Sequence, residues 1–72
     1  MVTIDDVILQ DGLEIIYNNI SELKSIRYSI YGHYSIIINF NSNIRTIRMK
    51  TGSDADGDYW YKYIDDLIEN HG

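Results

Sequence analysis

Hydrophobic and polar residues follow a helical period at both ends of the chain and a strand period in the middle. In the first segment, apolar residues recur at intervals of three and four, the spacing of one helix face. Thr3 followed by Asp6 is typical of a capping box that opens a helix. We therefore predict a helix over residues 4–18. Its apolar stripe consists of Leu9, Leu13, Ile16, Ile20 and Leu23.

The same segment has an alternative interpretation as a β-hairpin. Asp11-Gly12 lies between two apolar runs, and Asp-Gly in that setting is a strong signal for a two-residue hairpin turn. A second apolar stripe also blurs the helical pattern. It consists of Ile4, Val7, Ile8 and Ile15. The pattern favours the helix and leaves the hairpin as the alternative.

The middle of the chain alternates between apolar and polar residues, which predicts three strands over residues 25–31, 34–40 and 44–50. The first loop needs an odd number of residues to bring the apolar sides of its two strands onto one face. This condition predicts a three-residue turn around Gly32-His33. The apolar residues of these two strands are Ile26, Tyr28, Ile30, Tyr34, Ile36, Ile38 and Phe40.

The third strand should complete an antiparallel meander with one apolar face. A turn centred on Ser42-Asn43 places Ile38 opposite Ile47 and Ile36 opposite Met49. The other face is then polar and basic, and it stays open if both helices pack on the apolar side. It would carry Arg27, Ser29, Tyr31, Ser35, Ile37, Asn39, Thr46, Arg48 and Lys50.

The C-terminal segment has the clearest helical pattern. Ser53 or Asp54 can cap its start, and Asp56 and Asp58 stand in its first turn, where the helix dipole favours negative charge. The buried stripe should be Trp60, Ile64, Leu67 and Ile68. The complete pattern predicts one α+β domain over residues 1–72, with the element order α-β-β-β-α and both helices on one face of a three-stranded antiparallel sheet.

Composition narrows the class of protein. The chain has 72 residues and no cysteine, so disulfides, thiolate nucleophiles and cysteine-based metal sites are excluded. The N-terminal segment has acidic residues where a signal peptide would have its apolar run, and no segment has the length and composition of a membrane span. We therefore expect a cytoplasmic protein with no cofactor. A homodimer paired through a strand edge is neither required nor excluded.

Charge is sorted along the chain into three blocks. Residues 1–23 carry five acids and no base, residues 24–50 carry five bases and no acid, and residues 51–72 carry six acids and one lysine. The net charge is −5. Such segregation predicts a dipolar surface suited to charged macromolecular partners. Neither histidine has a nearby serine or cysteine placed for nucleophilic catalysis, and we expect no enzymatic activity.

The preferred hypothesis is a protein-binding module with an acidic helical surface. Asp54, Asp56, Asp58, Asp65, Asp66 and Glu69 would form this surface and bind a basic protein, such as a nuclease or another nucleic-acid-binding protein. Small acidic chains of this kind are similar in size and charge to accessory proteins of phages and mobile elements, including inhibitors of nucleases and defence complexes. This similarity rests on no motif.

A second hypothesis places single-stranded nucleic acid on the open sheet face. Tyr31 would stack on a base, and Arg27, Arg48 and Lys50 would contact phosphates. The net charge of −5 opposes this binding. The predicted order of elements is also that of the double-stranded RNA-binding domain, but that family has a basic cluster where this chain has Asp54, Asp56 and Asp58. The likeness ends at topology.

A third hypothesis is calcium binding. Asp54, Asp56 and Asp58, with Asp65 at the twelfth position, resemble the ligand spacing of an EF-hand loop. Tyr59 replaces the glycine that this loop requires, and Asp65 replaces its bidentate glutamate. An acid-rich helix start accounts for the same aspartates through the helix dipole.

Overall fold

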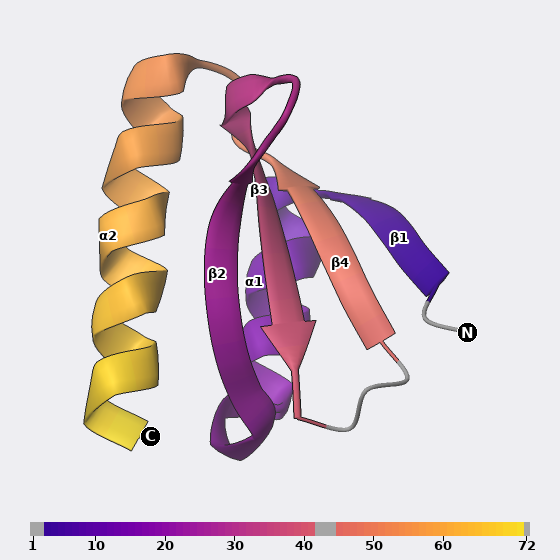
Figure 1. Ribbon diagram of the computed structural model, residues 1–72, viewed down its shortest axis with the longest axis vertical. Coiled ribbons are helices and arrows are strands. Elements are labelled where there is room, and N and C mark those ends of the chain that lie inside the picture. The colour runs from indigo at the N-terminus through magenta and orange to yellow at the C-terminus, as the bar shows by residue number, and fades with distance from the viewer. Residues whose placement is uncertain (1–2, 42–44, 72) are drawn as a thin grey trace.

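The computed structural model describes residues 3–41 and 45–71, which form a four-stranded mixed sheet with two helices on one face (Figure 1). The elements in chain order are β1 (Thr3–Ile8), α1 (Leu9–Asn18), the short 3₁₀ helix η1 (Ile20–Glu22), β2 (Leu23–Ser29), β3 (Gly32–Phe40), β4 (Arg45–Lys50) and α2 (Asp54–His71). The α+β class is as predicted, whereas the number of strands is not.

The prediction of a helix over residues 4–18 is wrong in its first part. Residues 3–8 form β1, which pairs in parallel with β4, and α1 begins only at Leu9. The capping box predicted at Thr3 and Asp6 is therefore absent, and Ile8 precedes the helix without a side-chain cap. The hairpin alternative is wrong as well, because Asp11 and Gly12 lie within α1. Pairing with a strand far along the chain prevails over local helical spacing here.

The sheet has the strand order β1-β4-β3-β2, so β1 and β2 are its two edges. The antiparallel meander predicted from the middle of the chain is confirmed in β2, β3 and β4. Its predicted register is confirmed too, with Ile38 opposite Ile47 and Ile36 opposite Met49. The turn predicted at Ser42-Asn43 and the strand start at Ile44 lie outside the described residues.

The first hairpin turn differs from the prediction. Ile30 and Tyr31 form the turn and Ser29 pairs with Gly32, whereas Tyr28 already pairs with Ile36. The extra residues of β3 are absorbed in an irregularity of the ladder, so Ile26 and Tyr28 still face the same side as Ile36 and Ile38. As a result Ile30 is 88% exposed and Tyr34 is 42% exposed, although both were expected in the core.

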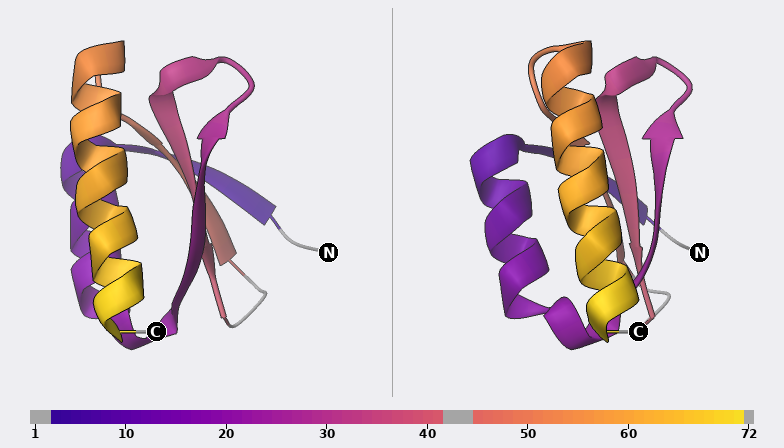
Figure 2. Two further views of the ribbon diagram at one scale, coloured as in Figure 1. Left: turned by 60° about the vertical axis from the view of Figure 1, so that its left-hand side comes forward. Right: turned by 90° about the vertical axis from the view of Figure 1, so that its left-hand side faces the viewer.

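Both helices cover the same face of the sheet, as expected (Figure 2). α1 contacts β1 and β4, and α2 contacts β2 and β3, so the helices lie side by side. The core between the layers is built from fully buried side chains of both helices, β3 and β4. These are Ile16, Ile36, Ile38, Ile47, Met49 and Ile64.

Gly57 fixes the position of α2 against the sheet. Its backbone is buried against β3, and a Cβ atom at this position would overlap the carbonyl oxygen of His33. Only glycine permits so close an approach of helix and strand backbones. The first turns of α2, with their aspartates, are thereby held beside the β2–β3 hairpin.

Candidate functional site

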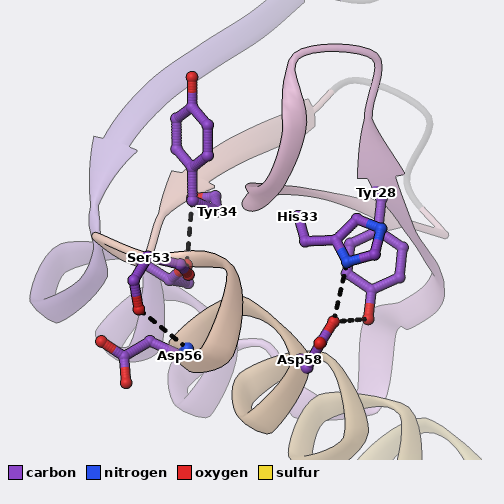
Figure 3. Close-up of polar contacts among 7 residues, drawn as sticks. Tyr28, His33, Tyr34, Ser53, Asp56 and Asp58 are labelled. Atoms are coloured by element: carbon purple, nitrogen blue, oxygen red, sulfur yellow. Dashed lines mark hydrogen bonds and ion pairs between the residues drawn. The ribbon is translucent and has the colours of Figure 1, made fainter.

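The acidic surface predicted from the sequence begins at the N-terminus of α2. Ser53 caps the helix, because its Oγ accepts a hydrogen bond from the backbone N–H of Asp56 at 3.1 Å (Figure 3). Asp54 and Asp56 stand in the first turn and are exposed. The helix dipole favours negative charge there, so these two residues already have a structural reason to be acidic.

Asp58 is engaged in a contact that joins α2 to the β2–β3 hairpin. Its Oδ1 accepts a hydrogen bond from the Tyr28 hydroxyl at 2.8 Å and lies 3.1 Å from Nδ1 of His33 (Figure 3). The Tyr28 ring is stacked between His33 and Tyr61, with centroid distances of 4.2 Å and 4.3 Å. Of the six predicted acids, Asp58 is therefore the one with a clear structural role.

Tyr28 is held in its neutral form by this environment. Burial of the phenol, followed by its hydrogen bond to Asp58, raises the pKa of Tyr28 to about 12. The Tyr61 hydroxyl also donates a hydrogen bond to the carbonyl oxygen of Ile26 at 3.4 Å. The sequence pattern does not predict the contact among Tyr28, His33 and Tyr61, since it depends on how α2 packs against β2 and β3.

The other acids of α2 have no ion-pair partner within residues 3–41 and 45–71. Asp54, Asp65 and Glu69 follow the same stripe as Asp58, at helical spacing. Asp56 shares the helical stripe of Tyr63, whose hydroxyl contacts α1. Asp66 lies on the outer side of the helix, opposite the buried Ile64. Lys62 is the single base of α2 and is exposed. The structure thus leaves a long surface on α2 on which the acids outnumber the single lysine and, Asp58 apart, form no ion pair within the described residues.

The open sheet face has a different character. Arg27, Ile37, Arg48 and Asp6 are neighbours in one row across all four strands. Nη1 of Arg48 lies 3.2 Å from Oδ1 of Asp6, and the Arg48 guanidinium lies 5.6 Å from the centre of the Tyr31 ring. Ile37 is only 4% exposed, because it lies between the two long arginine side chains. Arg48 therefore covers the sheet rather than projecting from it.

In a second row of this face, the polar side chains form hydrogen bonds with one another. Asn39 donates to Oγ of Ser25 at 3.1 Å and accepts from Oγ1 of Thr46 at 3.0 Å. At the edge of the sheet, Asp5 pairs with Arg45 at 3.5 Å. The addition of β1 therefore places acids next to two of the five bases in the middle block. These pairs could not be predicted from a helix over residues 4–18, because they form only when β1 pairs with β4.

The residues of the nucleic-acid hypothesis are brought together only in part. Tyr31, Arg48 and Lys50 line one shallow concavity together with Asp6. Arg27 lines another, with Lys24 and Asn39. The predicted platform is thus divided, and an acid stands in its main part.

The residues of the calcium hypothesis do not converge. Asp54, Asp56 and Asp58 lie within α2, where alternate residues point to different sides, whereas an EF-hand loop directs them to one centre. Across the described ranges 3–41 and 45–71, no three side chains of the His, Cys, Asp or Glu type come together as metal ligands would.

A group of aromatic side chains lies on the outer surface where the two helices meet. The hydroxyls of Tyr17 on α1 and Tyr63 on α2 are 2.8 Å apart, and their hydrogen bond raises the pKa of Tyr17. Trp60 packs edge-on against Tyr59 and Tyr63, with centroid distances of 5.0 Å and 5.5 Å. The three tyrosines and one tryptophan at residues 59–63 are the sequence signal for this group. The contact with Tyr17 could not be predicted from that segment alone, because Tyr17 lies on the other helix.

Comparison with other proteins adds no assignment, since no protein-family model, curated protein or solved structure matches the chain. Within the described residues, neither α1 nor α2 combines the length and apolar composition that crossing a bilayer requires.

Proposed function

We propose that this protein is a non-catalytic binding module that uses the acidic surface of α2 to engage a basic surface on another protein. The surface comprises Asp54, Asp56, Asp65, Asp66 and Glu69, with Asp58 tied to the hairpin at its margin. A basic surface that takes nucleic acid is the natural complement, because it already accommodates a row of negative charges.

One observation carries the proposal: the two charged regions of the fold differ in how far their charges are paired. On the sheet, Arg45 and Arg48 each have an acidic partner on β1. On α2, only Asp58 has an ion-pair partner among the described residues. Among the described residues, five acids of α2 thus have no ion-pair partner and lie along one helix that carries a single lysine. Such a field accelerates association with an oppositely charged partner.

Size and charge also suggest a biological setting for the protein. A small, acidic, cysteine-free domain that competes with nucleic acid for a nuclease or defence protein would suit a phage or mobile-element accessory protein. What supports this setting is size and charge alone. The sheet face offers a poorer nucleic-acid platform than α2 offers a protein interface, because Asp6 lies against its central arginine.

Charge reversal on α2 tests the proposal. In a pull-down from a low-GC bacterial lysate, the wild type should retain a basic, nucleic-acid-binding protein that added DNA displaces and that high salt releases. The triple variant Asp65→Lys, Asp66→Lys, Glu69→Lys should lose this protein. A matched control reverses Asp11, Glu14 and Glu22, three exposed acids outside α2 and without ion pairs in residues 3–41 and 45–71, and so changes the net charge equally.

The control variant should still bind. Equal capture by both triple variants would overturn the assignment of the interface to α2. Loss of capture by both would show that only the total charge matters. Circular dichroism of each variant establishes that the fold is intact before binding is compared.

A further inference from the structure

The solvent-facing side of α2 carries a shallow pocket in which aromatic rings and a carboxylate meet. Tyr59, Lys62, Tyr63 and Asp66 line it, and we refer to it as the α2 pocket. Tyr59 and Tyr63 are one helical turn apart and Asp66 follows in the next turn, so all three share one stripe. Tyr59 is 64% exposed, so its ring is accessible to a partner side chain.

The rings of the pocket are held in place before any partner binds. Trp60 makes edge-to-face contacts with Tyr59 and with Tyr63, at interplanar angles of 88° and 86°. The hydroxyl of Tyr63 is in turn fixed by Tyr17 of the neighbouring helix at 2.8 Å. A partner side chain that stacks here would therefore pay little of the entropy that ordering the rings would otherwise cost.

We propose that the α2 pocket is the anchor point of the acidic interface and that it takes an arginine side chain of the partner. This inference rests on the proposed function and adds the type of residue that the interface recognises. The electron-rich face of a tyrosine attracts a cation, and a carboxylate accepts two parallel hydrogen bonds from a guanidinium. A planar guanidinium can do both at once, whereas a lysine ammonium is a compact point charge that is more strongly hydrated.

Lys62 opposes this role and thereby supplies a sharp test. It lines the pocket and stands one helical turn before Asp66, within reach of that carboxylate. An incoming guanidinium must compete with the Lys62 ammonium and meets its positive charge. Removal of the ammonium should therefore strengthen binding of arginine, which is not expected if binding depends on packing alone.

The experiment compares an oligo-arginine peptide with an oligo-lysine peptide of equal length, each titrated into the full chain at low ionic strength. Trp60 is the only tryptophan of the protein and packs against two rings of the pocket, so its fluorescence reports binding. The wild type should bind the arginine peptide about two- to five-fold more tightly, the effect of one cation–π contact at an exposed site. Equal affinity for the two peptides would overturn the inference.

Substitutions in the α2 pocket test whether the preference for the arginine peptide over the lysine peptide arises there. Tyr59→Ala and Asp66→Asn should each reduce it, and Lys62→Ser should raise the affinity for the arginine peptide by about two-fold. Tyr31→Ala removes a ring of similar exposure, 63%, on the opposite face and should change nothing. Because Tyr59 is exposed, its loss should leave thermal stability nearly intact, which a melting curve checks.

The outcomes separate this inference from the proposed function. Binding of both peptides without preference, abolished by charge reversal at Asp65, Asp66 and Glu69, would keep the acidic interface and refute the arginine pocket. Binding that charge reversal on α2 does not reduce would refute both. A concentration-dependent change in Trp60 fluorescence without peptide would point instead to a second copy of this chain on the pocket and would also refute the inference.

Discussion

The residues that form the sheet and those that form α2 are both rich in charge, but the folded structure pairs their charges to different extents. On the open face, β1 brings Asp6 within 3.2 Å of Arg48, and at the sheet edge, on the side of Ile47, it brings Asp5 within 3.5 Å of Arg45. On α2, Asp58 alone has an ion-pair partner within residues 3–41 and 45–71. A block of like charge in a sequence is therefore available to bind another molecule only where the folded chain supplies no residues of opposite charge to pair with it.

The two surfaces also differ in how their side chains are fixed. On the open sheet face, polar side chains form hydrogen bonds with one another: Thr46 donates to Asn39, and Asn39 donates to Ser25. α2 instead fixes aromatic rings, while all its carboxylates except that of the half-buried Asp65 are exposed. Polar side chains that already have hydrogen-bond partners gain little from binding another molecule. Aromatic rings held in place beside carboxylates without ion pairs are typical of interface hot spots.

The largest expected effect on stability comes from a substitution that forces α2 away from the sheet. In Gly57→Ala, the new Cβ atom overlaps the His33 carbonyl oxygen, so helix and sheet must move apart. We expect the free energy of unfolding to fall by about 3 kcal/mol, even though alanine is the better helix former. Urea denaturation followed by circular dichroism measures it.

Gly12→Ala is the matched control for this variant. Its Cβ atom would approach Sδ of Met49 at 2.5 Å, a clash with a flexible side chain rather than with backbone. The loss should therefore be smaller than for Gly57→Ala. Equal stability of Gly57→Ala and the wild type would show that α2 is not seated through Gly57.

An intermediate effect is expected from Tyr28→Phe, which removes the hydrogen bond to Asp58 and keeps the stacked ring. The loss should be about 1 kcal/mol at neutral pH. The pH dependence provides a second signature. A phenol with a pKa of about 12 when folded and about 10 when unfolded favours the folded state fully below pH 10 and loses this contribution as the pH rises toward 12.

Melting temperatures recorded from pH 9 to 12 test this signature, since the wild type should lose more stability than Tyr28→Phe over that range. Tyr34→Phe is a suitable control, because Tyr34 is 42% exposed and its hydroxyl makes no hydrogen bond within the described residues. Parallel pH profiles for the wild type and Tyr28→Phe would contradict the contact between Tyr28 and Asp58.

The smallest effect on stability should follow from removing the acids that compensate the sheet. Asp5→Asn with Asp6→Asn breaks two partly exposed ion pairs and should cost less than about 1 kcal/mol. The same change frees Arg45 at the sheet edge and Arg48 on the open face, so affinity for a single-stranded oligonucleotide should rise above that of the wild type. Fluorescence anisotropy at low salt measures it. Unchanged affinity would show that these acids do not control the charge of the sheet.

The fold was predictable where the signal is local. Alternation identified β3 and β4 and their register, as the pairing of Ile38 with Ile47 shows. β1 was not predictable in this way, because its pairing with β4 spans most of the chain and Val7 fits a helical stripe as well as a strand. Once β1 was missed, the ion pairs of Asp5 and Asp6 were missed as a consequence.

The candidate site was predictable in its charges and not in its contacts. Composition and helical spacing identified the acids of α2, including Asp65 and Glu69. The role of Asp58 depends on Tyr28 and His33, which reach it only because Gly57 lets the helix approach β3. The α2 pocket likewise depends on the neighbouring helix, through Tyr17.

If α2, and not the sheet, is the binding surface for a charged partner, as we propose, the two surfaces should respond differently to charged ligands. A backbone amide NMR titration of the protein with the oligo-arginine peptide and, separately, with a single-stranded oligonucleotide at physiological salt measures this difference. The peptide should shift amides of α2, and the oligonucleotide should shift none. Oligonucleotide-induced shifts at Tyr31, Arg48 and Lys50, with α2 unaffected by the peptide, would contradict this proposal.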